Sequence, residues 1–91
     1  MAIIDVDSDA AVYCRGQRCG KLRGFITDEE KGRITNLIVE LKDQPERQYI
    51  LPVALTEATN DRRVYLIISG EELRTYPEFK REIIEALHEA S

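Results

Sequence analysis

The chain has 91 residues, enough for one small domain, and with 43% hydrophobic residues it is too apolar for a disordered protein. Thirteen Lys and Arg against seventeen Asp and Glu give a formal net charge of −4, which disfavours nucleic acid as a partner held by bulk electrostatics. No basic segment precedes an apolar run as in a signal peptide, and no long uncharged apolar stretch predicts a membrane span, so we expect a cytoplasmic protein.

The first two segments of the chain predict short strands. Residues 1–9 alternate apolar residues with acids from Ile4 onward, which is typical of an edge strand or an ordered arm. Residues 10–14 are a short apolar run, and the next four residues have turn composition. We therefore expect a strand that reverses at Gly16 into the next one.

A β-hairpin over residues 20–41 is the central predicted feature. Two runs rich in aliphatic and β-branched residues flank a polar turn that ends in Gly32, a residue able to adopt the positive φ of a hairpin loop. Period-2 alternation assigns one set to the core face: Leu22, Gly24, Ile26, Leu37, Val39 and Leu41. Ile38 falls on the other face and is a candidate for a second, smaller apolar contact. Gly24 inside a strand predicts a bend or the close approach of another backbone.

Three further segments complete the predicted sheet. Gln48–Pro52 reads as a strand that the proline must end or place at an edge, because proline has no N–H for the ladder. Residues 53–57 predict a crossing turn or short strand, and residues 60–63 have turn composition. Residues 64–68 form the most apolar strand.

From Ser69 onward the pattern becomes helical. Ser69 and Glu72 have capping-box spacing, which predicts a single helical turn. Thr75 and Glu78 repeat that spacing, and Pro77 suits a first helical turn, so we expect a helix within residues 76–91. Its apolar stripe of Phe79, Ile83 and Leu87 would pack either on the rest of the domain or on a dimer partner.

Taken together, these segments predict a mainly β fold. Five or six short strands followed by one helix are typical of a small β-barrel, here over residues 1–75, with a short helical turn. The C-terminal α-helix would occupy residues 76–91 of the same single domain.

With the strands placed in this order, the chain resembles the PRC-barrel domain over roughly residues 10–77. Four stretches in sequence carry the resemblance: GKLRGFITD at 20–28, GRITNLIV at 32–39, YILP at 49–52 and SGEELRTYP at 69–77. The resemblance implies a compact six-stranded PRC-type barrel that binds other macromolecules or itself. It implies no catalytic residue and no cofactor.

Basic residues cluster in the hairpin that begins the predicted barrel. Arg15, Arg18, Lys21 and Arg23 put four cations into nine positions without an acid. Such a patch can contact an acidic protein surface or RNA phosphates. The alternative is a solvated face that keeps an edge strand from indiscriminate pairing.

The two cysteines leave two interpretations open. Cys14 and Cys19 are close enough for a turn to bring them together in a reversible disulfide. Alternatively they are two small buried thiols in a reducing compartment. The sole histidine, His88, has no nucleophile or metal partner nearby in the sequence, so we identify no catalytic or metal-binding constellation.

These observations favour a non-enzymatic, PRC-barrel-like interaction or adaptor module that binds a protein partner, or itself as a homodimer. The alternative is a ribosome- or RNA-associated accessory protein that uses the basic patch from Arg15 to Arg23. An enzyme is the third class, and a large polar pocket would support it.

Overall fold

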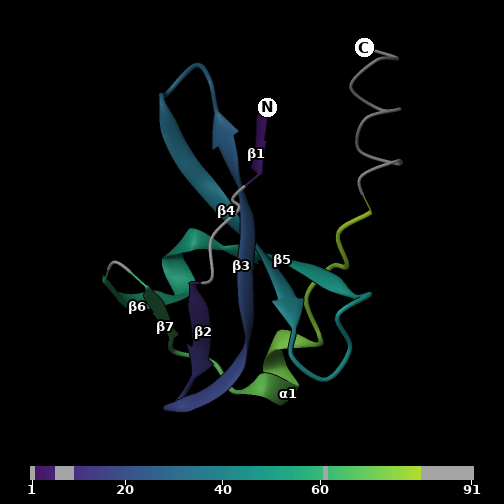
Figure 1. The fold of residues 1–91 in the computed structure, drawn as a ribbon. Coiled ribbons are helices and arrows are strands. Elements are labelled where there is room, and N and C mark those ends of the chain that lie inside the picture. The colour runs from purple at the N-terminus through teal and green to yellow at the C-terminus, as the bar shows by residue number, and fades with distance from the viewer. Residues whose placement is uncertain (1, 6–9, 61, 81–91) are drawn as a thin grey trace.

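The computed structural model describes residues 2–5, 10–60 and 62–80 (Figure 1). In chain order, its elements are β1 (Ala2–Asp5), β2 (Ala11–Cys14), β3 (Gln17–Asp28), β4 (Arg33–Leu41), β5 (Gln48–Pro52), the 3₁₀ turn η1 (Val53–Leu55), β6 (Thr56–Asn60), β7 (Arg63–Leu66) and α1 (Gly70–Leu73). The prediction of a mainly β chain with one short helical turn is confirmed.

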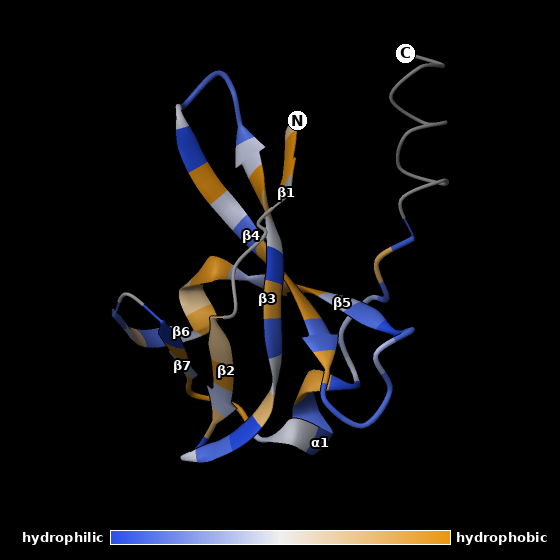
Figure 2. Cartoon of the chain, in the orientation of Figure 1, coloured by the Kyte–Doolittle hydropathy of each residue, from blue (hydrophilic) through white to orange (hydrophobic). Residues whose placement is uncertain are grey.

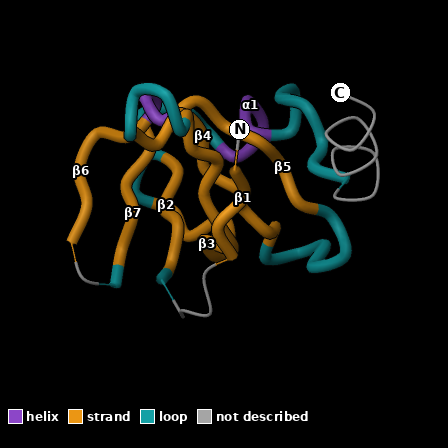
Figure 3. The backbone as a smooth tube through the Cα atoms, turned by 90° about the horizontal axis from the view of Figure 1, so that it is seen from above, coloured by secondary structure: helices purple, strands orange, loops and turns teal. Residues whose placement is uncertain are grey.

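The strands form one mixed sheet in the order β5-β4-β3-β2-β7-β6. All pairs are antiparallel except β2 with β7, which is parallel. Strand β3 is 12 residues long, so β2 pairs with its first half and β1 with its second half along the same edge (Figure 1). Seen from above, the sheet curves around its interior, with β6 and β5 toward its two ends (Figure 3).

Two details of the predicted architecture are not confirmed. The described residues contain seven strands rather than six. Residues 2–5, predicted as an edge strand or an ordered arm, pair as a strand, and so do residues 56–60, which overlap the segment predicted as a crossing turn or short strand. The strand order also runs from β5 to β6 without joining these two ends, so the sheet is not closed into a barrel.

The reversal predicted at Gly16 is a two-residue hairpin turn between β2 and β3. Arg15 and Gly16 both have positive φ, 49° and 83°. Two central residues with positive φ match the right-handed twist of the flanking strands, which is the geometry of a type I′ turn. The turn brings the neighbouring Cys14 and Gln17 into register.

A β-bulge in β3 corrects the predicted face of two residues, Gly24 and Ile26. Leu22 pairs with Val39 of β4, but Gly24 pairs with Ile38, so Arg23 is an extra residue on β3. The extra residue reverses the alternation that follows it. The prediction that Leu22 and Ile26 share a face is therefore wrong, although both are buried and hydrophobic residues do alternate with polar ones along the strand (Figure 2).

Two apolar clusters lie on opposite faces of the sheet, and the bulge places Ile26 in the second one. The main one lies on the concave side and consists of Ala10, Val12, Cys14, Leu22, Leu37, Val39, Leu41, Tyr49, Leu51, Val64, Leu66, Ile68 and Leu73. The second contains Ile26, Ile38 and Phe79, with Ile3 and Ile50 packed against them. The predicted second contact at Ile38 is thus confirmed, and this side chain is only 1% exposed.

The close approach predicted at Gly24 is also confirmed. A Cβ atom added there would lie 2.7 Å from the carbonyl oxygen of Ile4 in β1. Only a residue without a side chain lets β1 pair this closely with β3.

The C-terminal part agrees with the prediction at Ser69 and departs from it at Pro77. The Ser69 hydroxyl accepts a hydrogen bond of 3.1 Å from the Glu72 N–H and caps α1 as expected. Pro77 to Phe79 are extended rather than helical: Ile50 N–H donates to Pro77 O, and Phe79 N–H donates to Gln48 O. These bonds satisfy backbone groups along the edge of β5 and bury Phe79, which offsets the local helical preference.

The remainder of the predicted C-terminal helix, with Ile83, Leu87 and His88, lies outside the described residues. Among the helices within residues 2–5, 10–60 and 62–80, none has the length and apolar character needed to cross a membrane.

Candidate binding face and adjoining pocket

The structure divides the predicted basic patch into two pairs. Arg15 is held at the hairpin turn, where its Nε donates to the Ile67 carbonyl oxygen at 3.1 Å and its guanidinium lies 3.5 Å from a carboxylate oxygen of Glu72. Arg23, at the bulge, donates from Nε to a carboxylate oxygen of Glu40 at 3.2 Å. Both side chains therefore already bind groups of this chain.

Arg18 and Lys21 lie on the convex, outer face of the sheet. In the β2–β3 ladder, Arg18 is opposite Tyr13 and Lys21 is opposite Ala11. Directly paired residues share a face of the sheet. Val12, which lies between Ala11 and Tyr13 in β2, is fully buried on the inner side, so Ala11 and Tyr13 and their partners Lys21 and Arg18 face outward. Neither cation forms an ion pair with another residue of the described part of the chain.

Two tyrosines and an arginine that sequence reasoning missed complete this face. The parallel pairing of β2 with β7 puts Tyr13 beside Tyr65, and their rings stack with centroids 5.4 Å apart and planes at 24°. The Arg63 guanidinium carbon lies 5.8 Å from the Tyr13 ring centroid, within reach of a cation–π interaction. A hydrogen bond to Tyr65 is the main cause that raises the pKa of Arg63 above its usual value, and electrostatic interaction with Tyr13 and Tyr65 adds to it.

We call Tyr13, Arg18, Lys21, Arg63 and Tyr65 the tyrosine–arginine face. Across the strands, Arg18, Tyr13 and Tyr65 follow one another, and the next position, in β6, is the small, exposed Ala58. The face thus combines aromatic rings with three cations that form no ion pair within residues 2–5, 10–60 and 62–80, although the whole chain is acidic.

One carboxylate beside this face is that of Glu40 on β4. Glu40 lies opposite Lys21 in the ladder, and its carboxylate binds Arg23. Its side chain is only 14% exposed. The face therefore carries more positive than negative charge at the solvent boundary, which favours contact with an acidic group.

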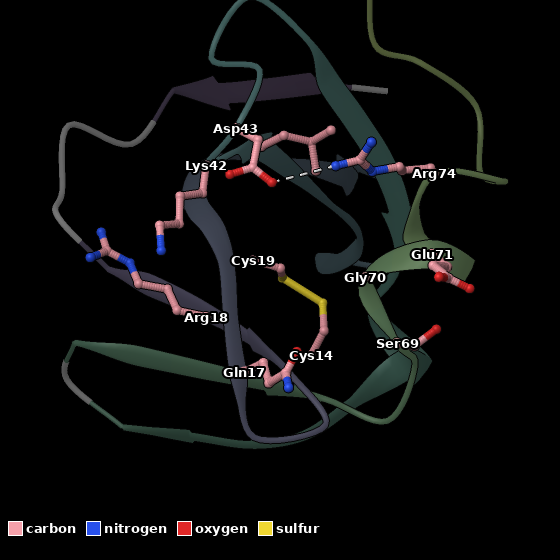
Figure 4. Close-up of a pocket in the computed structure, with 11 residues that line it drawn as sticks. Cys14, Gln17, Arg18, Cys19, Lys42, Asp43, Ser69, Gly70, Glu71 and Arg74 are labelled. Carbon is pink, nitrogen blue, oxygen red and sulfur yellow. Dashed lines mark ion pairs between the residues drawn. A yellow bond between two sulfur atoms is a disulfide. The ribbon is translucent and has the colours of Figure 1, made fainter.

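A pocket of about 560 Å³, lined by both charged and apolar groups, adjoins this face at the end of the sheet where β2, β3, β4 and α1 meet (Figure 4). Cys14 and Cys19 are joined by a disulfide in its centre, so of the two interpretations of these cysteines the structure has the bonded one. Arg18 and Lys42 extend along one side of the disulfide, and Glu71 lies on the other (Figure 4).

The sequence could have identified part of this site. Alternation around the buried Val12 and Val64 places Tyr13 and Tyr65 outside, but it cannot tell that these residues are neighbours. That contact depends on a parallel pairing of strands about 50 residues apart in sequence. Within the described residues, no cluster of three or more His, Cys, Asp or Glu side chains could hold a metal ion.

Comparisons with known proteins give no assignment for this site. No family model matches the chain, and none of the curated proteins matches it either. Inferences about function therefore depend on the geometry described above.

Proposed function

We propose that this chain is a non-enzymatic interaction module of the PRC-barrel type that binds an acidic protein segment through the tyrosine–arginine face. The observation that carries the proposal is the stacked pair Tyr13 and Tyr65 with the guanidinium of Arg63 beside it. Tyrosine and arginine are enriched among the residues that contribute most to protein–protein affinity.

The arrangement suits binding because the aromatic groups are held in place before a partner arrives. Each ring packs on the other, and Arg63 restrains Tyr13 from one side. Ordering side chains at an interface costs about 0.5–1.5 kcal/mol for each one immobilised, so a preordered pair lowers the cost of association. The neighbouring Arg18 and Lys21 select for negative charge and speed the encounter with an acidic partner.

Single-stranded RNA is the second candidate ligand, supported by the same ring pair. A base stacked on an aromatic side chain contributes about 1–3 kcal/mol, and cations beside the ring would contact phosphates. The net charge of −4 counts against this alternative, because nucleic-acid affinity depends mainly on phosphate neutralisation.

A binding assay with two labelled probes tests both ligands. The first is a peptide of eight glutamates around two tyrosines, and the second is an oligouridylate of about 12 nucleotides. Under the proposal, the wild-type chain binds the peptide more tightly, and Arg63→Ala and Tyr65→Ala each weaken binding by about 5- to 30-fold. Lys31→Ala, which removes an exposed cation in the distant β3–β4 turn, should leave affinity unchanged.

The outcomes separate the two candidates. Peptide binding that Lys31→Ala weakens as much as Arg63→Ala does would mean diffuse electrostatics and would contradict a defined site. Tighter, Tyr65-dependent binding of the oligouridylate would favour the RNA candidate instead.

We also propose that the chain forms a homodimer. Phe79, which we expected to pack either on the rest of the domain or on a dimer partner, is 8% exposed and packs on Ile26 and Ile38 of its own chain. Light scattering at tens of micromolar tests the dimer directly, and a monomer throughout that range would contradict it.

A further inference from the structure

We propose that the Cys14–Cys19 disulfide is a thiol–disulfide exchange site for a small thiol that carries carboxylate groups. The inference uses the adjoining pocket, which shares only Arg18 with the tyrosine–arginine face, and it does not depend on what binds that face. Three features support it: the unequal exposure of the two sulfur-bearing residues, the cations beside them, and the room in the pocket for an incoming ligand.

The two cysteines differ in their access to solvent. Cys14 is 3% exposed and belongs to the main apolar cluster, between β3 and β7. Cys19 is only partly buried, because it is the extra residue of a bulge in β3 and packs on the cluster from its rim. An attacking thiolate must reach a sulfur from outside, so Cys19 Sγ is the sulfur that is attacked.

The charges around the disulfide are arranged unequally. Arg18 and Lys42 flank it on one side and form no ion pair among residues 2–5, 10–60 and 62–80 (Figure 4). The backbone N–H of Lys42 donates to the Cys19 carbonyl oxygen at 2.9 Å, which pairs the backbones of these two residues; both line the pocket. Cations that line the same pocket attract an anionic thiol, and cations near a sulfur stabilise its negative charge.

The acids of the pocket do not cancel this effect. Asp43 lies 3.7 Å from the Arg74 guanidinium, so its charge is partly neutralised. Glu71 lies across the disulfide from Arg18 (Figure 4). The approach on the side of Arg18 and Lys42 therefore favours a ligand with negative charge, and the pocket volume of about 560 Å³ accommodates a small molecule.

The exchange balances in two steps. A thiolate RS⁻ attacks Cys19 Sγ, the bond between the two cysteines breaks, and its electron pair leaves on Cys14 Sγ, which takes a proton from solvent. A second RS⁻ attacks the R-bearing sulfur of the mixed disulfide, releasing RSSR and the Cys19 thiolate, which is then protonated. The two thiols have supplied the two electrons that reduce the disulfide. The Cys19 sulfur lies 3.4 Å from the Val12 carbonyl oxygen, which can accept a hydrogen bond from the new S–H group.

Reduction rates with three probes test the charge preference. Mercaptoacetate, 2-mercaptoethanol and cysteamine are anionic, neutral and cationic thiols, compared at equal thiolate concentration and low salt by alkylation and mass spectrometry. Because thiolates of different pKa differ in nucleophilicity, each rate is divided by the rate of the same thiol with a small uncharged disulfide, and these relative rates are compared. We expect mercaptoacetate to react about three- to tenfold faster than cysteamine, with the difference falling as salt rises. Combined Arg18→Gln and Lys42→Gln should remove the preference, and the matched control Lys31→Gln should keep it. A cysteamine rate equal to that of mercaptoacetate would overturn the proposal.

The site of attack is tested separately. In wild-type protein quenched early with acid, the mercaptoacetate adduct should be found on Cys19 by peptide mapping, and an adduct on Cys14 would overturn the assignment. Among single-cysteine variants, Cys14→Ser should react with dithionitrobenzoate about tenfold or more faster than Cys19→Ser, because the remaining thiol is the accessible one. Equal rates in two folded variants would contradict the proposed asymmetry.

Discussion

Replacing Gly20 with alanine tests how closely β3 and β4 are packed. Gly20 is buried on the inner side, opposite Val12 of β2 and Leu41 of β4. An added Cβ atom would overlap the carbonyl oxygen of Glu40 and would lie 3.0 Å from that carbonyl carbon. The obstacle is backbone of a central strand, so it cannot rotate away as a side chain could.

The cost follows from what must move. To admit a methyl group, β3 and β4 must separate by about an ångström, which weakens the ladder hydrogen bonds beside Gly20. Each lost bond costs about 0.5–1.5 kcal/mol, and each buried backbone group left unpaired about 1–3 kcal/mol. We therefore expect the free energy of unfolding to fall by about 3–5 kcal/mol, from a total of about 5–14 kcal/mol for a chain of this length.

Urea denaturation followed by far-ultraviolet circular dichroism measures this loss by linear extrapolation. The control is Gly70→Ala at the start of α1, where an added Cβ has no heavy atom within 4 Å. That variant should be neutral or more stable by up to about 1 kcal/mol, because alanine restricts the unfolded chain. A loss below about 1 kcal/mol for Gly20→Ala would refute the reasoning and mean that the strands separate at little cost.

Three further substitutions test individual contacts. Phe79→Ala should lower the free energy of unfolding by about 3 kcal/mol in the same urea assay, since it empties the centre of the second apolar cluster, whereas Lys80→Ala at the exposed neighbour should not. Ser69→Ala should cost about 1 kcal/mol, measured by thermal unfolding, because it removes the cap of α1. A double-mutant cycle on Arg23 and Glu40 should give a coupling below about 1 kcal/mol, and a larger value would show that this partly exposed pair contributes more than surface pairs do.

Local sequence patterns predicted the structure correctly where adjacent residues determine the backbone conformation. The turn after Cys14 and the cap at Ser69 each depend on a few adjacent residues, and the structure has both where they were predicted. The opposite happened at Pro77, where the spacing of Thr75 and Glu78 indicates a helix. Hydrogen bonds to β5, far away in sequence, select the extended form there.

The candidate site likewise combines features that adjacent residues determine with features that depend on residues far apart in sequence. Composition and spacing singled out Arg18 and Lys21 but could not separate them from Arg15 and Arg23, whose partners Glu72 and Glu40 lie on other elements. Nor could they find Tyr65 or Arg63, since the parallel pairing of β2 with β7 is made across most of the chain. Likewise, the sequence left the state of the two cysteines open, and the bulge at Cys19 sets its exposure.

By itself, the sequence determined that this is a mainly β chain, which segments form most of its strands, and which residues are apolar enough to be buried. These properties depend on local composition and on a period of two residues. Only the tertiary structure decided which face each residue occupies after the bulge at Arg23, and which side chains meet across β3, β2 and β7. One inserted residue reverses every later side chain of a strand, and contacts between distant strands depend on how the whole sheet packs, so neither follows from local preference.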